Sequence, residues 1–124
     1  MTGHADGILR YYNADTVLIN QYSKNALTEF QIKLKKVLKS AGIATIDVPY
    51  SPKTGNPISA EGLYINFLQI NNFILVPSFK RTEDEKVLRL FEQLYPLRVV
   101  KPIDSQEIAK DGGVLNCISW NIAR

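Results

Sequence analysis

The same order of local structure signals occurs twice in this chain, and that repetition restricts the folds open to it. Each copy has two short runs of β-forming residues, then a helical pattern, then a third β-forming run. The expected strands cover residues 8–12, 16–19, 44–48, 63–68, 73–76 and 97–100. The copies align with Val17 matching Ile74 and with Pro49 matching Pro102. We therefore predict an α/β chain that contains two ββαβ units.

Each helical pattern has an apolar face and a recognisable start. In the first pattern, apolar residues recur every three or four positions, at Leu27, Phe30, Leu34, Val37, Leu38 and Ala41. Asn25 is the expected N-cap of this helix. In the second pattern, Thr82 and Glu85 have the spacing of a capping box. The expected core face of the second helix consists of Val87, Leu90, Phe91 and Leu94.

Glycines mark the points at which the repeated segments open. The units are expected at about residues 4–50 and 60–103, with a final strand at about 113–120. Gly7 precedes the first strand of the first unit, Gly62 precedes that of the second, and Gly112–Gly113 precedes the final strand. If the first strands converge on an axis of pseudo-symmetry, residues beside these glycines meet there. His4 and Cys117 are therefore predicted to come together although they lie at opposite ends of the chain.

Composition restricts the class of protein. The chain has 124 residues, 45% hydrophobic and 22% charged, which fits one small globular domain. No apolar run reaches the roughly 18 residues of a membrane helix, and a single cysteine suits the reducing cytoplasm.

Much of the basic surplus behind the net charge of +3 lies in Lys33, Lys35, Lys36 and Lys39. We expect these lysines on a solvated helix face and, because no aromatic residues are interleaved with them, we predict no nucleic-acid binding. One histidine and one cysteine cannot complete a four-ligand zinc site, so we expect no metal.

The residues His4, Asp6 and Cys117 have the chemistry of a catalytic group. A cysteine attacks as its thiolate, and a neighbouring imidazole favours that form and carries protons. Asp6 would share a face with His4 if their segment were extended, and a carboxylate there can bind a guanidinium group. Each residue also has a structural interpretation. Cys117 could be a small buried apolar residue, His4 part of a frayed terminus, and Asp6 a turn or capping residue.

Three segments of the chain resemble one known family. Residues 3–11, which begin Gly-His-Ala-Asp, look like the Gly-His-x-Asp motif of the agmatine deiminase and bacterial (Porphyromonas-type) peptidylarginine deiminase family. Residues 64–67 and 74–79 resemble its strand pair that ends in Val-Pro-x-Phe, and residues 112–120 resemble the segment around its nucleophile. The segments occur in family order across nearly the whole chain. We therefore expect the chain to be the C-terminal portion of such a protein.

The resemblance implies a fold, a reaction and a role for each residue. The family fold is a pseudo-symmetric α/β propeller of five ββαβ units, of which this chain would supply about two units and one strand. Cys117 matches the nucleophile, and His4 matches the acid and base. Asp6 matches the carboxylate that binds the guanidinium, and Gly113 is also expected to contribute to substrate binding. The implied reaction converts a guanidinium group, of the agmatine or peptidyl-arginine type, into a ureido product and ammonia through a covalent cysteine intermediate, without a cofactor.

The chain departs from the family pattern in two respects. Asn116 stands where many agmatine deiminases have histidine, which leaves agmatine, arginine and peptidyl-arginine open as substrates. The family's Trp-x-Arg-Asp segment, which carries a second guanidinium-binding carboxylate, has no counterpart here. We therefore expect the isolated chain to have little or no deiminase activity and to pair with a missing N-terminal portion or with a second copy. The alternative is an inactive fragment that serves as a binding or oligomerising module.

Overall fold

The computed structural model describes residues 5–22, 28–52, 55–56, 58–120 and 122. In chain order the elements are η1 (Ala5–Gly7), β1 (Leu9–Tyr11), β2 (Thr16–Gln21), α1 (Glu29–Ser40), β3 (Ala44–Pro49), β4 (Leu68–Ile70), β5 (Phe73–Ser78), α2 (Thr82–Leu94), β6 (Val99–Asp104) and η3 (Ile108–Asp111). The order β-β-α-β thus occurs twice, from β1 to β3 and from β4 to β6.

Each ββαβ run forms a three-stranded sheet of its own. In the first sheet β1 pairs antiparallel with β2, and β2 pairs parallel with β3. In the second sheet β4 pairs antiparallel with β5, and β5 pairs parallel with β6. Parallel neighbours need a crossover connection, which α1 supplies in the first sheet and α2 in the second. The predicted α/β class is therefore confirmed, as two small open sheets with one helix each.

The strand register corrects one part of the sequence alignment. Gln21, the last residue of β2, lies opposite Pro49, whereas Ser78, the last residue of β5, lies opposite Asp104. The structural counterpart of Pro49 is therefore Asp104, and the match to Pro102 was wrong. Pro102 lies inside β6, which is an edge strand, where a missing N–H group is tolerated. The third strand of the second unit consequently extends beyond the proline that was expected to close it.

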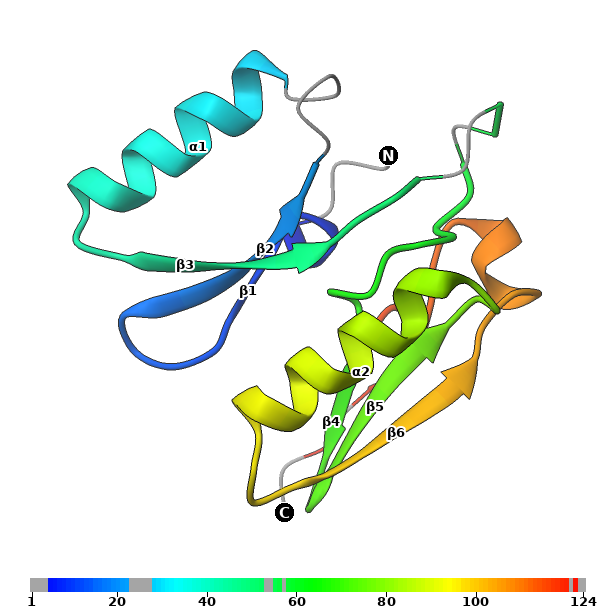
Figure 1. Ribbon diagram of the computed structural model, residues 1–124. Coiled ribbons are helices and arrows are strands. Elements are labelled where there is room, and N and C mark those ends of the chain that lie inside the picture. The colour runs from blue at the N-terminus through cyan, green and yellow to red at the C-terminus, as the bar shows by residue number, and fades with distance from the viewer. Residues whose placement is uncertain (1–4, 23–27, 53–54, 57, 121, 123–124) are drawn as a thin grey trace.

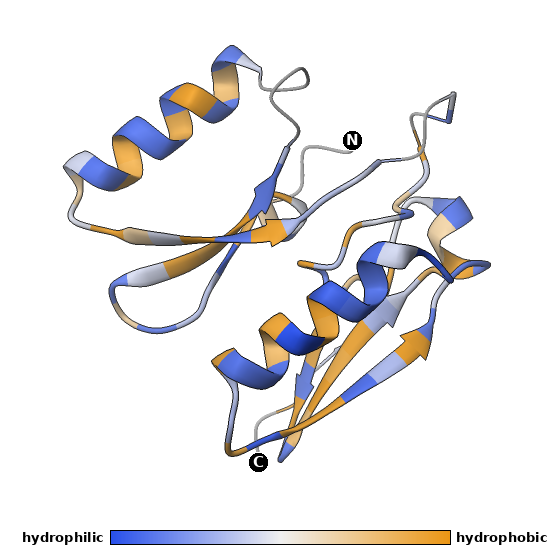
Figure 2. Cartoon of the chain, viewed as in Figure 1, coloured by the Kyte–Doolittle hydropathy of each residue, from blue (hydrophilic) through white to orange (hydrophobic). Residues whose placement is uncertain are grey.

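The helices and sheets stack in layers (Figure 1). α1 packs against the first sheet, while α2 lies between the two sheets and contacts β3 on one side and β5 and β6 on the other. Bands of hydrophobic and hydrophilic residues alternate along both helices (Figure 2). The main core surrounds α2, and its fully buried members from the two sheets are Leu18, Val48, Ile74 and Val76. Because α2 packs against both sheets, the two units share one core.

The helix α1 is covered on one side only. Its N-cap is Thr28, whose side chain closes a capping box, whereas the predicted cap Asn25 and the predicted core residue Leu27 lie outside the described residues. The expected burial was wrong for Phe30 and Val37, which are 57% and 62% exposed. α1 forms an outer layer of the molecule, so only the side chains that face the first sheet are buried (Figure 1).

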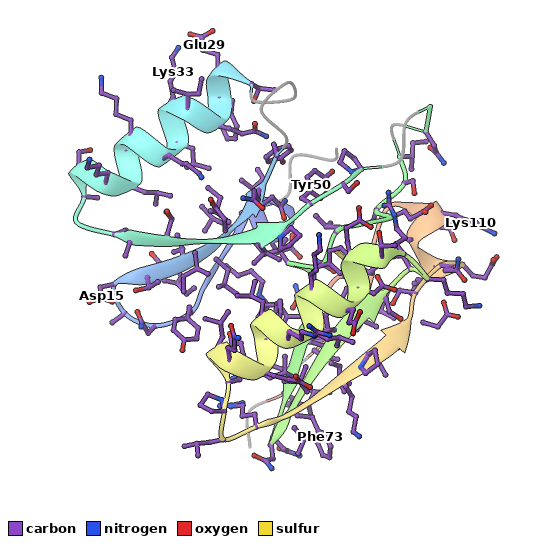
Figure 3. The ribbon with its side chains drawn as sticks, in the orientation of Figure 1. Asp15, Glu29, Lys33, Tyr50, Phe73 and Lys110 are labelled. Carbon is purple, nitrogen blue, oxygen red and sulfur yellow. The ribbon has the colours of Figure 1, made fainter. Side chains whose placement is uncertain are left out.

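Three of the four lysines of α1, Lys33, Lys36 and Lys39, are exposed as predicted, while Lys35 is partly buried. Lys33 forms an ion pair of 2.6 Å with Glu29 near the start of the helix, and Figure 3 shows both side chains at the outer end of the molecule. Lys35 reaches back to Asp47 of β3, with 2.8 Å between Nζ and Oδ1. These exposed pairs contribute little to stability. No helix in the described part of the chain is both long and apolar enough to cross a membrane.

The helix α2 starts differently from its prediction. Thr82 is its first residue, not its cap, and the carboxylate of Asp84 accepts hydrogen bonds from the N–H groups of Phe79 and Arg81. The predicted capping box of Thr82 and Glu85 was therefore wrong. The predicted core face was confirmed, since Val87 and Phe91 are fully buried while Leu90 and Leu94 are partly buried against the same core.

Two segments that were predicted as strands form turns instead. Residues 62–67 precede β4, and the N–H group of Asn66 donates to the carbonyl of Leu63. Within residues 113–120, the N–H group of Ile118 donates to the carbonyl of Val114, and no residue of this segment belongs to a strand. Local hydrogen bonds of this kind satisfy the backbone without a neighbouring strand. The final strand of the prediction was therefore wrong.

Candidate active site

Three turns that are far apart in the sequence meet at one point of the molecule. Asp6 lies in η1, Asn66 lies in the loop before β4, and Cys117 lies in the turns after η3. The thiol Sγ of Cys117 donates to Oδ2 of Asp6 at 3.6 Å. Asp6 and Cys117, both predicted site residues, are therefore in contact. The convergence expected beside the opening glycines was that of His4 and Cys117, and His4 lies outside the described residues.

The carboxylate of Asp6 receives several donors. Its Oδ2 accepts hydrogen bonds from Nδ2 of Asn116 at 2.9 Å and from Nδ2 of Asn66 at 3.0 Å, besides the thiol of Cys117. Burial alone would raise the pKa of Asp6, but these three hydrogen bonds and one from the backbone of Asp6 outweigh it and hold the pKa below its ordinary value of 3.8. Asp6 is therefore an anion at neutral pH, and it can bind a cationic group.

Asn66 is a site residue that the sequence analysis missed. Its side chain is fully buried, and its Oδ1 accepts from the backbone N–H groups of Asn116 at 3.1 Å and of Cys117 at 3.2 Å. One asparagine thus holds both the carboxylate of Asp6 and the backbone beside the thiol. The signal that could have found it is its place in the sequence, because Asn66 lies in the second of the three segments that open at glycines.

Gly113 packs directly against Cys117. A Cβ atom at position 113 would lie 2.9 Å from Cβ of Cys117 and 3.6 Å from its Sγ. The first distance is shorter than real Cβ contacts allow, so only glycine lets the chain curl this tightly around the thiol. Gly113, predicted to contribute to substrate binding, lies at the wall of the site and shapes the position of Cys117.

These residues line one hollow of about 560 Å³, whose wall is formed by Asp6, Ile108, Asp111, Gly112, Gly113, Asn116, Cys117 and Ile118. Cys117 is exposed to it, so the interpretation of this cysteine as a buried apolar residue was wrong. The wall contains two carboxyl groups, those of Asp6 and Asp111, and each is negatively charged when it is ionised. Within the described residues, no group of three or more His, Cys, Asp and Glu side chains is arranged to hold a metal ion. The arrangement suits a cationic ligand that is held beside a nucleophilic thiol.

The two loops that carry Asp6 and Asn66 are anchored to each other. The guanidinium of Arg10 on β1 lies 4.1 Å from the ring centroid of Phe67 and donates a hydrogen bond to the carbonyl of the same residue. Burial lowers the pKa of Arg10, while nearby Tyr95 and Asp6 favour its charged form. Nδ2 of Asn20 donates to the carbonyl of Gly7 at 2.7 Å. These contacts fix η1 and the loop before β4 at the position where the site forms.

The remaining predicted site residue is His4, which lies outside the described residues. Asp6 was expected to share a face with His4 in an extended segment, but residues Ala5–Gly7 form a turn of 3-10 helix. That argument was therefore wrong for Asp6. Asp6 reaches the site because its turn precedes β1 at the meeting point of the three segments.

A model of the Porphyromonas-type peptidyl-arginine deiminase family matches residues 1–122. The chain belongs to this family. The match covers all three segments that the sequence analysis compared with the family, and it includes every residue of the site described above.

The relatives and structural neighbours of this deiminase-family chain are considerably longer than the chain itself. The agmatine deiminase of Pseudomonas savastanoi pv. phaseolicola is 32% identical over 77 residues, which cover 61% of this chain and 21% of the relative. The solved structure of agmatine deiminase from C. jejuni superposes with a TM-score of 0.75 and 22% identity, over 92% of this chain and 37% of that chain. The agmatine deiminase of Enterococcus faecalis gives a TM-score of 0.73 and 18% identity, over 94% of this chain and 39% of that chain. The chain thus spans about a fifth of the length of the curated relatives that it matches, and the structural likeness shows the fold.

Proposed function

We propose that the site hydrolyses a guanidinium group to a ureido group and ammonia, with Cys117 as nucleophile. Membership of the deiminase family supports this reaction class. The observation that carries the proposal is the contact of 3.6 Å between Sγ of Cys117 and Oδ2 of Asp6 in one hollow. It puts a group that binds cations beside a group that attacks carbon. The candidate substrates for this reaction are agmatine, arginine and peptidyl-arginine.

In the proposed reaction, Asp6 binds N–H groups of the guanidinium and keeps its central carbon near Cys117. The thiolate adds to this carbon and forms a C–S bond, after which one C–N bond breaks. His4 gives the leaving nitrogen its proton, so ammonia departs and a thiouronium intermediate stays on the cysteine. Water, deprotonated by His4, then adds to the same carbon. The C–S bond breaks, and the thiolate of Cys117 and the ureido product are released.

Asn66 and Gly113 have supporting roles in this proposal. Asn66 holds the backbone N–H group of Cys117 at 3.2 Å from its Oδ1, and it holds the carboxylate of Asp6 through its Nδ2. Gly113 leaves room for the side chain of Cys117. Neither residue needs to change its protonation state. Both act by fixing the distance between the nucleophile and the carboxylate.

We further propose that the two units belong to a pseudo-symmetric α/β propeller, whose other units cover faces that are exposed here. Val48 on β3 lies opposite Asn20, and Ile103 on β6 lies opposite Pro77, so the two occupy the same place in their sheets. Val48 is fully buried beneath α2, whereas Ile103 is 37% exposed. A further helix on the second sheet would bury that face as α2 buries the face of the first. The larger size of the solved relatives, of which this chain covers 35–39%, supports this arrangement.

The proposal includes a second guanidinium-binding carboxylate, supplied by another part of the propeller or by a second copy of the chain. The 124-residue chain alone is therefore expected to turn over agmatine, arginine and peptidyl-arginine slowly or not at all. The site itself should still recognise a cation. Selective alkylation of Cys117 by 2-chloroacetamidine, a cationic reagent, over neutral 2-chloroacetamide tests this directly.

The experiment compares both reagents on the wild-type chain and on the Asp6→Asn variant, with Cys117→Ser as the control for the labelled position. We expect the amidine to react faster than the amide with the wild-type chain, and the preference to fall at least tenfold in Asp6→Asn, because the charged partner is lost. Equal rates for the two reagents would contradict the proposed site and favour a non-enzymatic assembly module. Turnover by the pure chain that depends on Cys117 would contradict the need for a second carboxylate.

A further inference from the structure

Asn116 is a part of the site that the proposed reaction leaves without a role. Its Nδ2 donates to Oδ2 of Asp6 at 2.9 Å, the shortest of the three side-chain hydrogen bonds to that carboxylate. Its backbone N–H group donates independently to Oδ1 of Asn66 at 3.1 Å and approaches the carbonyl of Asn66 at 3.2 Å. The backbone of Asn116 is therefore held by Asn66, and its side chain is free to serve Asp6.

The side-chain donors to Asp6 in the described part of the chain all reach the same oxygen. The side chains of Asn116, Asn66 and Cys117 donate to Oδ2, and Oδ1 receives no side-chain donor from the described residues. The two amide donors therefore hold Oδ2 in place, so that an incoming N–H group at Oδ1 would displace neither of them. A guanidinium bound to Oδ1 would lie in the hollow that Cys117 also lines.

We propose that Asn116 is a positioning residue. Together with Asn66 it holds Oδ2 of Asp6, so that Oδ1 faces the guanidinium. The hydrogen bond from Asn116 to Asp6 does not depend on pH. The inference rests on the proposed function, because it assigns the orientation of the substrate-binding carboxylate. An amide side chain does not titrate between pH 4 and pH 9, so its hydrogen bond is present throughout that range. An imidazole in its place would become a cation near pH 6.5 and would compete with the substrate for Asp6.

Other ionisable groups face Asp6 and enter the pH dependence. Arg10 approaches from β1, Cys117 donates its thiol, and Asp111 lies across the hollow at the end of η3. His4, which is also ionisable, precedes η1 in the sequence. Each variant is therefore compared with the wild-type chain at the same pH, so that the contributions of these four groups cancel.

The test measures two quantities on the full chain. The first is the ratio of the alkylation rates of Cys117 by 2-chloroacetamidine and by 2-chloroacetamide, in which the thiolate displaces chloride in both cases. The second is the pKa of Asp6, followed by carbon NMR of its carboxyl group. The variants are Asn116→Ala and Asn116→His, with Asn72→Ala, in the exposed turn between β4 and β5, as the matched control.

We expect Asn116→Ala to lower the amidine preference about tenfold and to raise the pKa of Asp6, because a charge-assisted hydrogen bond is lost. Asn116→His should match the wild-type preference at pH 8 and fall below it at pH 5.5, where an imidazolium repels the amidine. Asn72→Ala should leave both quantities unchanged. The backbone hydrogen bonds of residue 116 are kept in every variant, and urea unfolding checks that each one folds.

The inference is overturned if Asn116→Ala has the wild-type preference and the wild-type pKa of Asp6, or if Asn72→Ala causes the same loss. If Asn116→Ala does not fold, the pH profile of Asn116→His decides, since a profile parallel to that of the wild-type chain would also overturn it. These outcomes are distinct from failure of the proposed function. That failure would appear as equal rates of the two reagents with the wild-type chain, or as a complete enzyme that releases no ammonia.

Discussion

At the scale of single residues, the site depends on a close approach of the backbone to Cys117 that only glycine allows. Cys117 lies against the α-carbon of Gly113, and a methyl group there would come within 2.9 Å of Cβ of Cys117. Gly7 also lies next to the site, in η1, but a methyl group at that position would meet Leu63 at an ordinary contact distance of 3.8 Å. The two glycines are therefore a matched pair, in which only one has a steric reason to be glycine.

We expect Gly113→Ala to slow the labelling of Cys117 by 2-chloroacetamidine at least tenfold, because the thiol is displaced from Asp6. Overpacking of this kind also destabilises a protein by about 1–3 kcal/mol. Gly7→Ala should change the labelling rate less than about twofold and leave stability within about 1 kcal/mol of the wild type. Labelling by mass spectrometry and urea unfolding measure both effects. Equal behaviour of the two variants would show that Gly113 is not needed for the geometry of the thiol.

The sequence led to some of these residues and not to others for physical reasons. Asp6 and Cys117 could be predicted from their side-chain chemistry and from the family motifs, whereas the repeat predicted only that His4 and Cys117 would meet. Asn66 lies in an apolar run, where its amide gives no sign that it binds two distant segments. The expectation for Asp6 used the wrong local geometry, since Ala5–Gly7 is a turn. Asp6 nevertheless contacts Cys117, because its turn lies where the three segments meet.

At the scale of elements, the loop before β4 has the residue types of a strand, but it connects distant parts of the chain. Tyr64, Ile65, Asn66 and Phe67 are each at most 1% exposed. Their β-forming character predicted a strand, but the segment forms turns, and the side chains of Tyr64 and Asn66 bind different parts of the chain. The hydroxyl of Tyr64 donates to Oδ1 of Asp84 at 2.6 Å, at the start of α2, while Asn66 serves the site. A propensity scale cannot predict such a loop, because long-range contacts determine its shape.

The contact between Tyr64 and Asp84 gives a prediction for high pH. Burial and then the hydrogen bond to Asp84 raise the pKa of Tyr64 far above its ordinary value of 10.0. A tyrosine whose folded pKa is raised stabilises the fold fully below pH 10, and this contribution is lost as the pH rises above 10. Tyr64→Phe should cost about 0.5–1.5 kcal/mol at pH 7, and the difference from the wild type should shrink at pH 10.5.

Urea unfolding at the two pH values measures this difference. Burial also raises the pKa of Tyr50 to about 12, which weakens both proteins equally and cancels in the comparison. Tyr11→Phe is the control, because Tyr11 is 67% exposed and its replacement should alter stability at neither pH. A Tyr64→Phe variant whose deficit is the same at pH 7 and pH 10.5 would show that ionisation of this tyrosine does not limit stability.

At the scale of the whole molecule, helix α2 determines which faces are buried. The repeat predicted two similar units, but it did not predict that α2 would pack on both sheets while α1 packs on one. The exposure of Phe30 and Val37 on α1 follows from this, as does that of Phe73 on the second sheet, which Figure 3 labels at the end of that sheet away from the first. Periodicity identifies an apolar face, but only the neighbouring layer determines whether that face is covered.

Two equivalent positions in the repeat allow a controlled test of whether further units cover the second sheet. Val48 and Ile103 occupy the same place in the two sheets, and only Val48 is covered by a helix. Val48→Lys should prevent folding or cost several kcal/mol, because it buries an unpaired charge. Ile103→Lys should cost less than about 1 kcal/mol in this chain and should reduce any self-association, because its side chain reaches solvent. Urea unfolding and sedimentation velocity measure the two effects. If Ile103→Lys destabilises the chain as much as Val48→Lys does, the second sheet is already covered within this chain and needs no further unit.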